Sequence, residues 1–221
     1  MRIDPAGYPF IIGALALAAV GAVGAVAHVA GVAASWAFAL IFALLGAFFT
    51  FFFRDPDRQA PSATSDDDVL SPADGNVLFA GPAMADAAPP GSWRQISIFL
   101  SPMDVHVNRV PVSGRVTRVT LTRGRYLPAY RPDAATRNER SEIWIDHDGQ
   151  QIVARQIVGI LARRVVCRLT DGATVKAGER LGIMKFGSRM DVFVPETAVI
   201  SVKVGEAVRG GETVIAVLHS K

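Results

Sequence analysis

Cysteine is almost absent from this sequence of 221 residues, since Cys167 is the only one. A single cysteine excludes an internal disulfide and a zinc site built from several cysteines. Its expected role is that of a small buried apolar residue. The net charge is only +3, which is compatible with contact to an anionic bilayer or a phosphate group. It is too weak and too scattered to predict a nucleic-acid-binding protein.

Charge is missing altogether from one long stretch, because no Asp, Glu, Lys or Arg occurs from Phe10 to Phe53. One crossing of a bilayer takes about 20 apolar residues, so this stretch has the length of two transmembrane helices. We expect the helices at about 10–30 and 33–53, with a break near 31–35. The sequence thus predicts a membrane-anchoring helical hairpin in residues 1–53.

Positive charges flank the apolar stretch, with Arg2 before it and Arg54 and Arg58 after it. Such charges favour the cytoplasmic side of a membrane. We therefore expect the remaining domain on the cytoplasmic side of the membrane. The alternative is a cleaved signal peptide, because Ala25-Val26-Ala27 resembles a processing site. The second apolar run directly after it favours a retained hairpin.

The composition changes after the apolar stretch. Residues 54–68 are rich in Pro, Ser and Asp and predict a linker. Residues 69–221 contain short bursts of apolar residues bounded by Gly, Pro and Asp, which is typical of antiparallel strands. The bursts that predict strands lie at 76–79, 95–100, 114–121, 143–145 and 152–158. Ala80–Gly91 is expected to be a loop, and no sustained helical period follows Phe53. The predicted fold class is mainly β.

A weak repeat marks the C-terminal part. Residues 171–181, 202–208 and 208–214 each contain a valine, a glycine-containing turn, a glutamate and then an apolar residue. We interpret these segments as duplicated hairpins. The pattern resembles the barrel-sandwich hybrid of biotinyl and lipoyl carrier domains. It raises an alternative function, a membrane-tethered carrier or adaptor modified at Lys185, although Phe186 stands where such carriers usually have a second methionine.

Three motifs occur in a fixed order along the chain. They are Ser71-Pro72-Ala73-Asp74-Gly75, the segment from Leu100 to Pro111 that contains His106, and the segment from Met184 to Asp191 that contains Gly187-Ser188. Together with Asn138-Glu139-Arg140 they resemble the phosphatidylserine decarboxylase family in its short bacterial form. The resemblance covers about residues 54–221. It implies an enzyme that is made as an inactive precursor.

The Gly187-Ser188 pair is suited to self-cleavage. Gly187 has no side chain to obstruct attack by the Ser188 hydroxyl on the preceding carbonyl, and it tolerates a strained backbone. The resemblance implies that this attack gives an ester and that elimination and hydrolysis then turn Ser188 into a pyruvoyl group. It also implies a β chain, 1–187, and an α chain, 188–221, which stay together.

The resemblance implies the rest of the reaction as well. The pyruvoyl group forms a Schiff base with the amino group of phosphatidylserine and accepts the electron pair released with carbon dioxide. Phosphatidylethanolamine is the product. No external cofactor and no metal are expected, because the electron acceptor is formed from the chain itself.

A serine hydroxyl needs a base to take its proton and a further group to hold that base. His147 lies in a predicted hairpin turn and His219 near the end of the sequence, so both are expected in solvent, and His106 is the candidate acid and base. Asp74 is the candidate orienting group, although Pro-Ala-Asp-Gly is also an ordinary turn. Longer family members have a second histidine where this chain has Arg109, so the processing base stays open.

The predicted partner is phosphatidylserine within the bilayer. A lipid with two acyl chains stays in the membrane, so an anchored active site would meet it at high local concentration. The sequence leaves open which residues contact the lipid, whether another serine phospholipid is the substrate, and whether the protein is a homo-oligomer.

Overall fold

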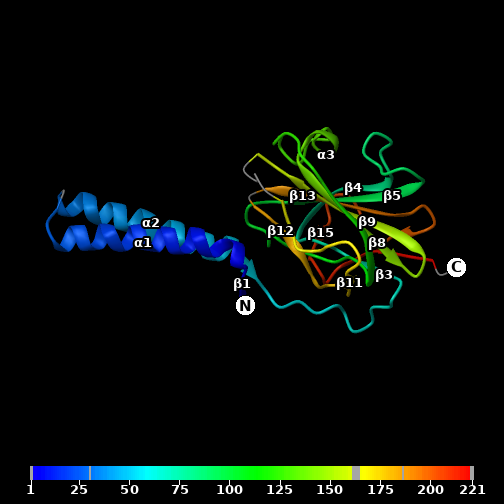
Figure 1. Cartoon of the computed structure of the whole chain (residues 1–221), viewed down its shortest axis with the longest axis horizontal. Helices are drawn as coiled ribbons and strands as arrows, with labels where there is room; N and C mark the ends of the chain where they lie inside the picture. The colour runs from blue at the N-terminus through cyan, green and yellow to red at the C-terminus, as the bar shows by residue number, and fades with distance from the viewer. Residues whose placement is uncertain (1, 30, 161–164, 186, 220–221) are drawn as a thin grey trace. The chain divides into compact units, whose positions relative to one another are not determined.

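A computed structural model of the chain describes residues 2–29, 31–160, 165–185 and 187–219 (Figure 1). The chain divides into two compact units, Met1–Asp57 and Arg58–Lys221. The first residues of the predicted linker therefore belong to the first unit, and the others belong to the second.

The first unit is built from two helices, α1 (Tyr8–Val26) and α2 (Val32–Phe52), which lie side by side (Figure 1). A Cβ atom on Gly21 of α1 would lie 2.9 Å from the backbone nitrogen of Ala39 of α2, so a glycine allows the close approach. The break between the helices comes earlier than predicted. Ala30, the predicted end of the first helix, lies outside the described residues.

The two helices are long and apolar enough to cross a membrane. Only 17% and 11% of the residues in their most apolar windows are buried. A helix in the core of a soluble domain would be mostly buried, so the exposed apolar surface favours association with a membrane. A short ladder that the sequence did not predict joins the ends of the unit, where β1 (Arg2–Ile3) pairs with β2 (Arg54–Asp55).

The second unit is mainly β, as the sequence predicts. Its large sheet has eight strands in the order β11-β7-β8-β9-β13-β5-β4-β15, all paired antiparallel, and it curls (Figure 1). Its strands are β4 (Gly75–Pro82), β5 (Trp93–Leu100), β7 (Gly114–Thr122), β8 (Arg140–His147), β9 (Gln150–Val158), β11 (Thr174–Val175), β13 (Ser188–Pro195) and β15 (Ala207–Val208). The five predicted strands are confirmed, and most are longer than predicted.

Two smaller sheets complete the second unit, in the orders β10-β12-β6 and β14-β16-β3. Their strands are β3 (Asp68–Leu70), β6 (Val107–Arg109), β10 (Val165–Cys167), β12 (Arg180–Met184), β14 (Val199–Ile200) and β16 (Val214–Val217). One hydrophobic core joins all three sheets, with Ile143 from the large sheet, Leu181 from one small sheet and Ile215 from the other. Both small sheets therefore pack against one face of the large sheet.

One local prediction needs correction. The predicted loop at Ala80–Gly91 begins only after Pro82, because β4 continues pairing with β5 up to that residue. One helical turn, α3 (Ala134–Arg137), lies after Phe53, which agrees with the prediction that no sustained helical period follows that residue. Four residues are too few to produce a helical period in the sequence.

The C-terminal repeat exists, but its units are turns and not hairpins. In Lys176–Glu179, Lys203–Glu206 and Arg209–Glu212 the glutamate N–H donates to the carbonyl of the first residue, each at 3.1 Å. The third residue of each turn is a glycine with φ between +74° and +87°. The strand next to the first turn, β11, pairs with β7, whereas β15 pairs with β4 at the other edge of the large sheet. The duplicated segments thus extend opposite edges of one sheet.

Candidate active site

Strand β13 positions the predicted cleavage site in the middle of the large sheet. Ser188 is its first residue and lies between Leu100 of β5 and Val158 of β9. The Ser188 side chain is fully buried, and its Oγ has no hydrogen-bond partner in the described part of the chain. An unpaired buried hydroxyl costs about 1–3 kcal/mol. Such a group calls for an explanation, and a catalytic role is one of the few available.

The carbonyl of Gly187 lies directly against the backbone of Gly159. A Cβ atom on Gly159 would lie 2.0 Å from the Gly187 oxygen, so only glycine fits there. Gly187 itself has φ +69°, a left-handed conformation that glycine adopts readily. The role of Gly159 is not predictable from the sequence, because this residue follows strand β9 and belongs to none of the three motifs.

His106 contacts the backbone N–H of Gly187, which belongs to the peptide bond before the predicted scissile one. Its ring is fully buried, with Nδ1 2.9 Å from the carbonyl oxygen of Asp104 and Nε2 3.3 Å from the backbone nitrogen of Gly187. A carbonyl only accepts hydrogen bonds, so Nδ1 carries the ring proton and Nε2 accepts from the Gly187 N–H. An unprotonated Nε2 beside the Gly187-Ser188 peptide is the state that a general base requires.

An apolar cavity of about 350 Å³ opens beside Gly187. Besides Gly187, it is lined by Phe99, Pro102, Pro128, Ala129, Tyr130 and Ile160. The Tyr130 ring packs edge-on against Phe99, with ring centroids 6.0 Å apart, yet Tyr130 is largely exposed. The site therefore combines a buried hydroxyl, a neutral histidine and an apolar surface around the Gly187-Ser188 pair.

Comparison with known proteins decides the family. The family model described as phosphatidylserine decarboxylase matches residues 45–216. Three similar proteins are each named phosphatidylserine decarboxylase proenzyme. The one from Salinibacter ruber is 44% identical over 76% of this chain and 75% of its own length. Those from Oleidesulfovibrio alaskensis and Chlorobium limicola are 42% and 39% identical over 97% of this chain and 93% and 99% of their own lengths.

The chain belongs to the phosphatidylserine decarboxylase family. The resemblance predicted from its motifs is confirmed, and membership makes the chain an enzyme of the decarboxylase class. The match covers the β unit up to Ala216 together with the end of α2. It leaves no support for the alternative of a carrier modified at Lys185.

Asp74 is the predicted orienting group, but its side chain contacts partners other than His106. Its Oδ2 lies 2.7 Å from Nη2 of Arg58, and its Oδ1 accepts from the Gly210 N–H at 2.8 Å. The pKa of Asp74 is raised, chiefly by burial and also by the charge of Asp104, while the Gly210 N–H and Arg58 lower it. The group that contacts Nδ1 of His106 is instead the backbone carbonyl of Asp104. A role of Asp74 in processing stays a prediction.

A second internal repeat explains the contacts of Asp74. Pro72–Gly75 and Pro111–Gly114 precede β4 and β7, and Ser113 corresponds to Asp74. Ser113 Oγ accepts from the Ala177 N–H at 3.0 Å, as Asp74 accepts from Gly210. Both side chains therefore stabilise a turn of the C-terminal repeat, and only Asp74 adds a buried negative charge.

The remaining predicted residues have structural partners. His147 is buried, with Nδ1 2.8 Å from the Ser113 carbonyl oxygen, so the prediction of a solvated histidine was wrong, although the adjacent turn at Asp148-Gly149 is present. His219 is exposed as predicted. Arg109 is buried and donates to the Gly178 carbonyl at 3.1 Å, so it holds the first repeated turn.

Asn138, from the fourth motif, supports the strand next to the cleavage site. Its side-chain nitrogen donates to the carbonyls of Leu127 and Val158, both at 2.8 Å, and its oxygen accepts from the Leu127 N–H. Val158 is the residue opposite Ser188 in β9. Asn138 thus ties the loop that lines the apolar cavity to the strand that flanks Ser188.

Proposed function

We propose that this chain decarboxylates phosphatidylserine to phosphatidylethanolamine through a pyruvoyl group that it forms from Ser188 after cutting its own Gly187-Ser188 peptide. The observation that carries the proposal is the buried Oγ of Ser188, which has no hydrogen-bond partner among the described residues, next to Gly187, whose own N–H contacts His106. The names of the related proenzymes support the substrate and the need for processing.

The first step is attack by Ser188 Oγ on the carbonyl carbon of Gly187, while a base takes the hydroxyl proton. His106 is the proposed base, since its Nε2 is unprotonated and 3.3 Å from the backbone nitrogen of Gly187, the residue whose carbonyl is attacked. The C–N bond breaks, and the Gly187 carboxyl becomes an ester of Oγ with the Ser188 amine free. Gly159 leaves room for the carbonyl oxygen at which negative charge develops.

The second step breaks the ester. Loss of the α-proton of Ser188 expels the Gly187 carboxylate and leaves a dehydroalanine. Water hydrolyses the corresponding imine, ammonia leaves, and the new α chain of residues 188–221 begins with a ketone. Strand β13 of that chain stays between β5 and β9 of the β chain, so the ketone is held in place by two ladders.

The residues around the site have defined tasks in decarboxylation. The pyruvoyl group supplies a ketone that takes the substrate amine as a Schiff base and accepts the electron pair released with carbon dioxide. His106 holds the proton for the substrate carbon, and the Asp104 carbonyl fixes the orientation of its ring. The apolar cavity that Phe99 and Tyr130 line receives the glycerol and acyl portion of the lipid and excludes water.

The proposed location follows from the first unit. Its two helices anchor the enzyme in a bacterial inner membrane, and Arg2 and Arg54 at their outer ends favour a cytoplasmic catalytic unit. Protease added to intact spheroplasts should leave the second unit whole, and protease added after lysis should digest it. Digestion in intact spheroplasts would place the unit on the other side.

Self-cleavage is tested with Ser188→Ala and, as a control, Ser201→Ala at an exposed position. A denaturing gel and intact-mass measurement should show two chains for the wild type and the control, with the smaller chain blocked at its N-terminus and reactive toward hydrazine reagents. Ser188→Ala should remain one chain without decarboxylase activity. Normal turnover by uncleaved Ser188→Ala would refute the pyruvoyl mechanism.

The role of His106 is tested with His106→Ala against His219→Ala, which changes an exposed histidine. Removing a general acid or base lowers a rate by about 10²–10⁴-fold, so both self-cleavage and decarboxylation should slow by that order. The control should match the wild type. If His106→Ala cleaves itself at the normal rate, another group is the processing base.

Asp74 acts in this proposal through its charge. Its carboxylate lies within electrostatic range of Asp104, whose carbonyl holds His106, and it stabilises the imidazolium formed during attack. The Asp74→Ser variant keeps the contact with the turn, as Ser113 does in the other repeat, but removes the charge. We expect about tenfold slower self-cleavage, equivalent to about 1.4 kcal/mol. An unchanged rate would reduce Asp74 to a turn residue.

A further inference from the structure

A second polar cavity, of about 230 Å³, lies on the face of the large sheet opposite to the Ser188 side chain. The pairing of the strands places the cavity on that face. Arg140 of β8 is opposite Ile157 of β9, and Ile157 is opposite Arg189 of β13, so the three side chains point to the same face of the sheet. Ser188 directly precedes Arg189 and points to the other face. The cavity also shares no lining residue with the apolar cavity beside Gly187, so it is separate from the proposed active site.

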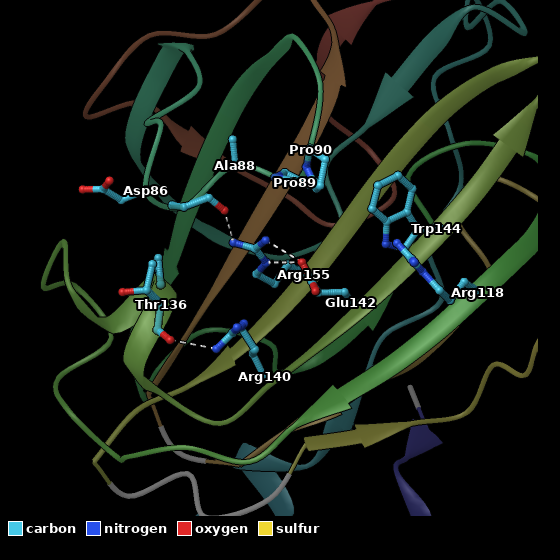
Figure 2. Close-up of a pocket in the computed structure, with 12 residues that line it drawn as sticks. Asp86, Ala88, Pro89, Pro90, Arg118, Thr136, Arg140, Glu142, Trp144 and Arg155 are labelled. Atoms are coloured by element: carbon cyan, nitrogen blue, oxygen red, sulfur yellow. Dashed lines mark hydrogen bonds and ion pairs between the residues drawn. The ribbon is translucent and has the colours of Figure 1, made fainter.

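Strand β8 contributes alternate residues to this cavity, and Figure 2 shows them with the arginines of β7 and β9. Glu142 is already occupied, since Arg155 donates to it through Nε at 2.9 Å and also donates to the Ala87 carbonyl at 2.6 Å. This ion pair therefore leaves neither side chain available to pair with a ligand. The Asp86 carboxylate, the other acid in the lining, points away from the arginines in Figure 2.

Two arginines of the cavity form no ion pair of their own in the described part of the chain. The guanidinium of Arg118 lies 4.4 Å from the centroid of the Trp144 ring, and within the described ranges neither Arg118 nor Arg140 forms an ion pair. Arg140 donates only to backbone carbonyls, of which that of Thr136 at 2.8 Å is the nearer. The pKa of Arg140 is lowered by burial and by the nearby charge of Arg155, while the charge of Glu142 raises it. A negative ligand would offset the repulsion between the two arginines.

Two buried N–H groups in the same cavity also lack an acceptor. They are Nε of Arg140 and Nε1 of Trp144, neither of which has a hydrogen-bond partner among the residues the structure describes. Both groups are donors only. The ligand that completes the site must therefore accept several hydrogen bonds from different directions and carry negative charge. A tetrahedral phosphate meets these conditions, and planar guanidinium groups bind it well.

We propose that Arg118, Arg140 and Trp144 form a binding site for a phosphate group, separate from the decarboxylation site. The phosphate can come from inorganic phosphate or from the headgroup of an anionic lipid, since both present the same oxygens. The lining also includes Pro89 and Pro90 of the β4–β5 loop and Thr136 of α3. A bound phosphate thus joins that loop and α3 to the sheet.

The test is calorimetric titration of the full-length protein, held in phosphatidylcholine nanodiscs, with inorganic phosphate at constant ionic strength. The variants are Arg118→Gln and Arg140→Gln, and the control is Arg137→Gln, an exposed arginine that pairs with Asp133. We expect saturable binding by the wild type and the control and at least tenfold weaker binding by both variants. Trp144→Phe keeps the ring under Arg118 but removes one donor, so it should bind several-fold more weakly.

A second titration uses short-chain phosphatidylglycerol, which has a phosphate but no serine. Tighter binding of this lipid than of inorganic phosphate identifies a headgroup site, and the reverse identifies a free-phosphate site. Self-cleavage on a gel verifies that each variant folds, because the cavity lies on the other face of the sheet. The proposal is overturned if the wild type binds neither ligand saturably, or if Arg118→Gln and Trp144→Phe both bind like the wild type.

Discussion

Replacing Gly159 by alanine tests how the carbonyl at the cleavage site is positioned. The added Cβ would lie 2.0 Å from the Gly187 oxygen, whereas an ordinary contact begins at 3.4 Å. Either the carbonyl or the end of β9 must then move by about 1.4 Å. The φ of Gly159 is not in the left-handed region, so the clash itself is the main effect of the substitution.

A displacement of about 1 Å at a reacting centre lowers a rate by about 10²-fold. We therefore expect self-cleavage of Gly159→Ala to slow by at least 100-fold. Overpacking in a well-packed region also lowers the free energy of unfolding by about 1–3 kcal/mol, which most domains tolerate. The variant should accumulate as a folded, uncleaved precursor.

The assay follows newly made protein on a denaturing gel and measures the rate at which the precursor disappears. Circular dichroism and a thermal melt establish that the precursor is folded. Gly81→Ala is the matched control, since its Cβ would meet only the Phe79 ring at 3.8 Å in the same sheet. Wild-type cleavage by a folded Gly159→Ala protein would show that the position of the carbonyl does not depend on this glycine.

Three further predictions concern stability and reactivity. Burial raises the pKa of Asp74 in the folded protein, so its protonated side chain stabilises the fold below pH 3.8, and this stabilisation is lost as the pH rises through the raised pKa. Denaturant titrations from about pH 3.5 upward should therefore show the wild type losing stability relative to Asp74→Asn. A difference that stays constant with pH would contradict this. Burial also raises the pKa of the Cys167 thiol, so iodoacetamide at pH 7.5 should alkylate the native protein more slowly than the denatured chain, and equal rates would contradict this. Ile143→Ala removes a fully buried side chain from the core of the large sheet and should lower the free energy of unfolding by about 2–5 kcal/mol in urea titrations, whereas exposed Val199→Ala should change it by less than about 1 kcal/mol.

The sequence predicted the features that depend on local patterns. The missing charge between Phe10 and Phe53 predicted two apolar helices, and short apolar bursts predicted strands of the large sheet. The motif around Gly187-Ser188 predicted the family because it combines with two other motifs at large separations in the chain. Each of these signals can be read without knowing what the segment packs against.

Features that depend on tertiary neighbours were not predictable. His147 precedes an Asp-Gly turn, which suggests solvent, yet the Ser113 carbonyl covers its ring. Gly159 looks like an ordinary glycine until the Gly187 oxygen is placed against it. The repeat predicts hairpins, whereas β11 and β15 pair with strands about 60 to 130 residues earlier in the chain, which the local sequence does not indicate.

The central position of β13 bears on the order of folding and the proposed cleavage. If the chain is cut at Ser188 as proposed, the partners β5 and β9 belong to the larger fragment, and contacts within one polypeptide become contacts between two molecules. Under that proposal we expect folding to precede cleavage. Once denatured, the mature enzyme would have to reassemble from separate fragments at a rate that depends on concentration, so its thermal inactivation should be irreversible and governed by the rate of unfolding.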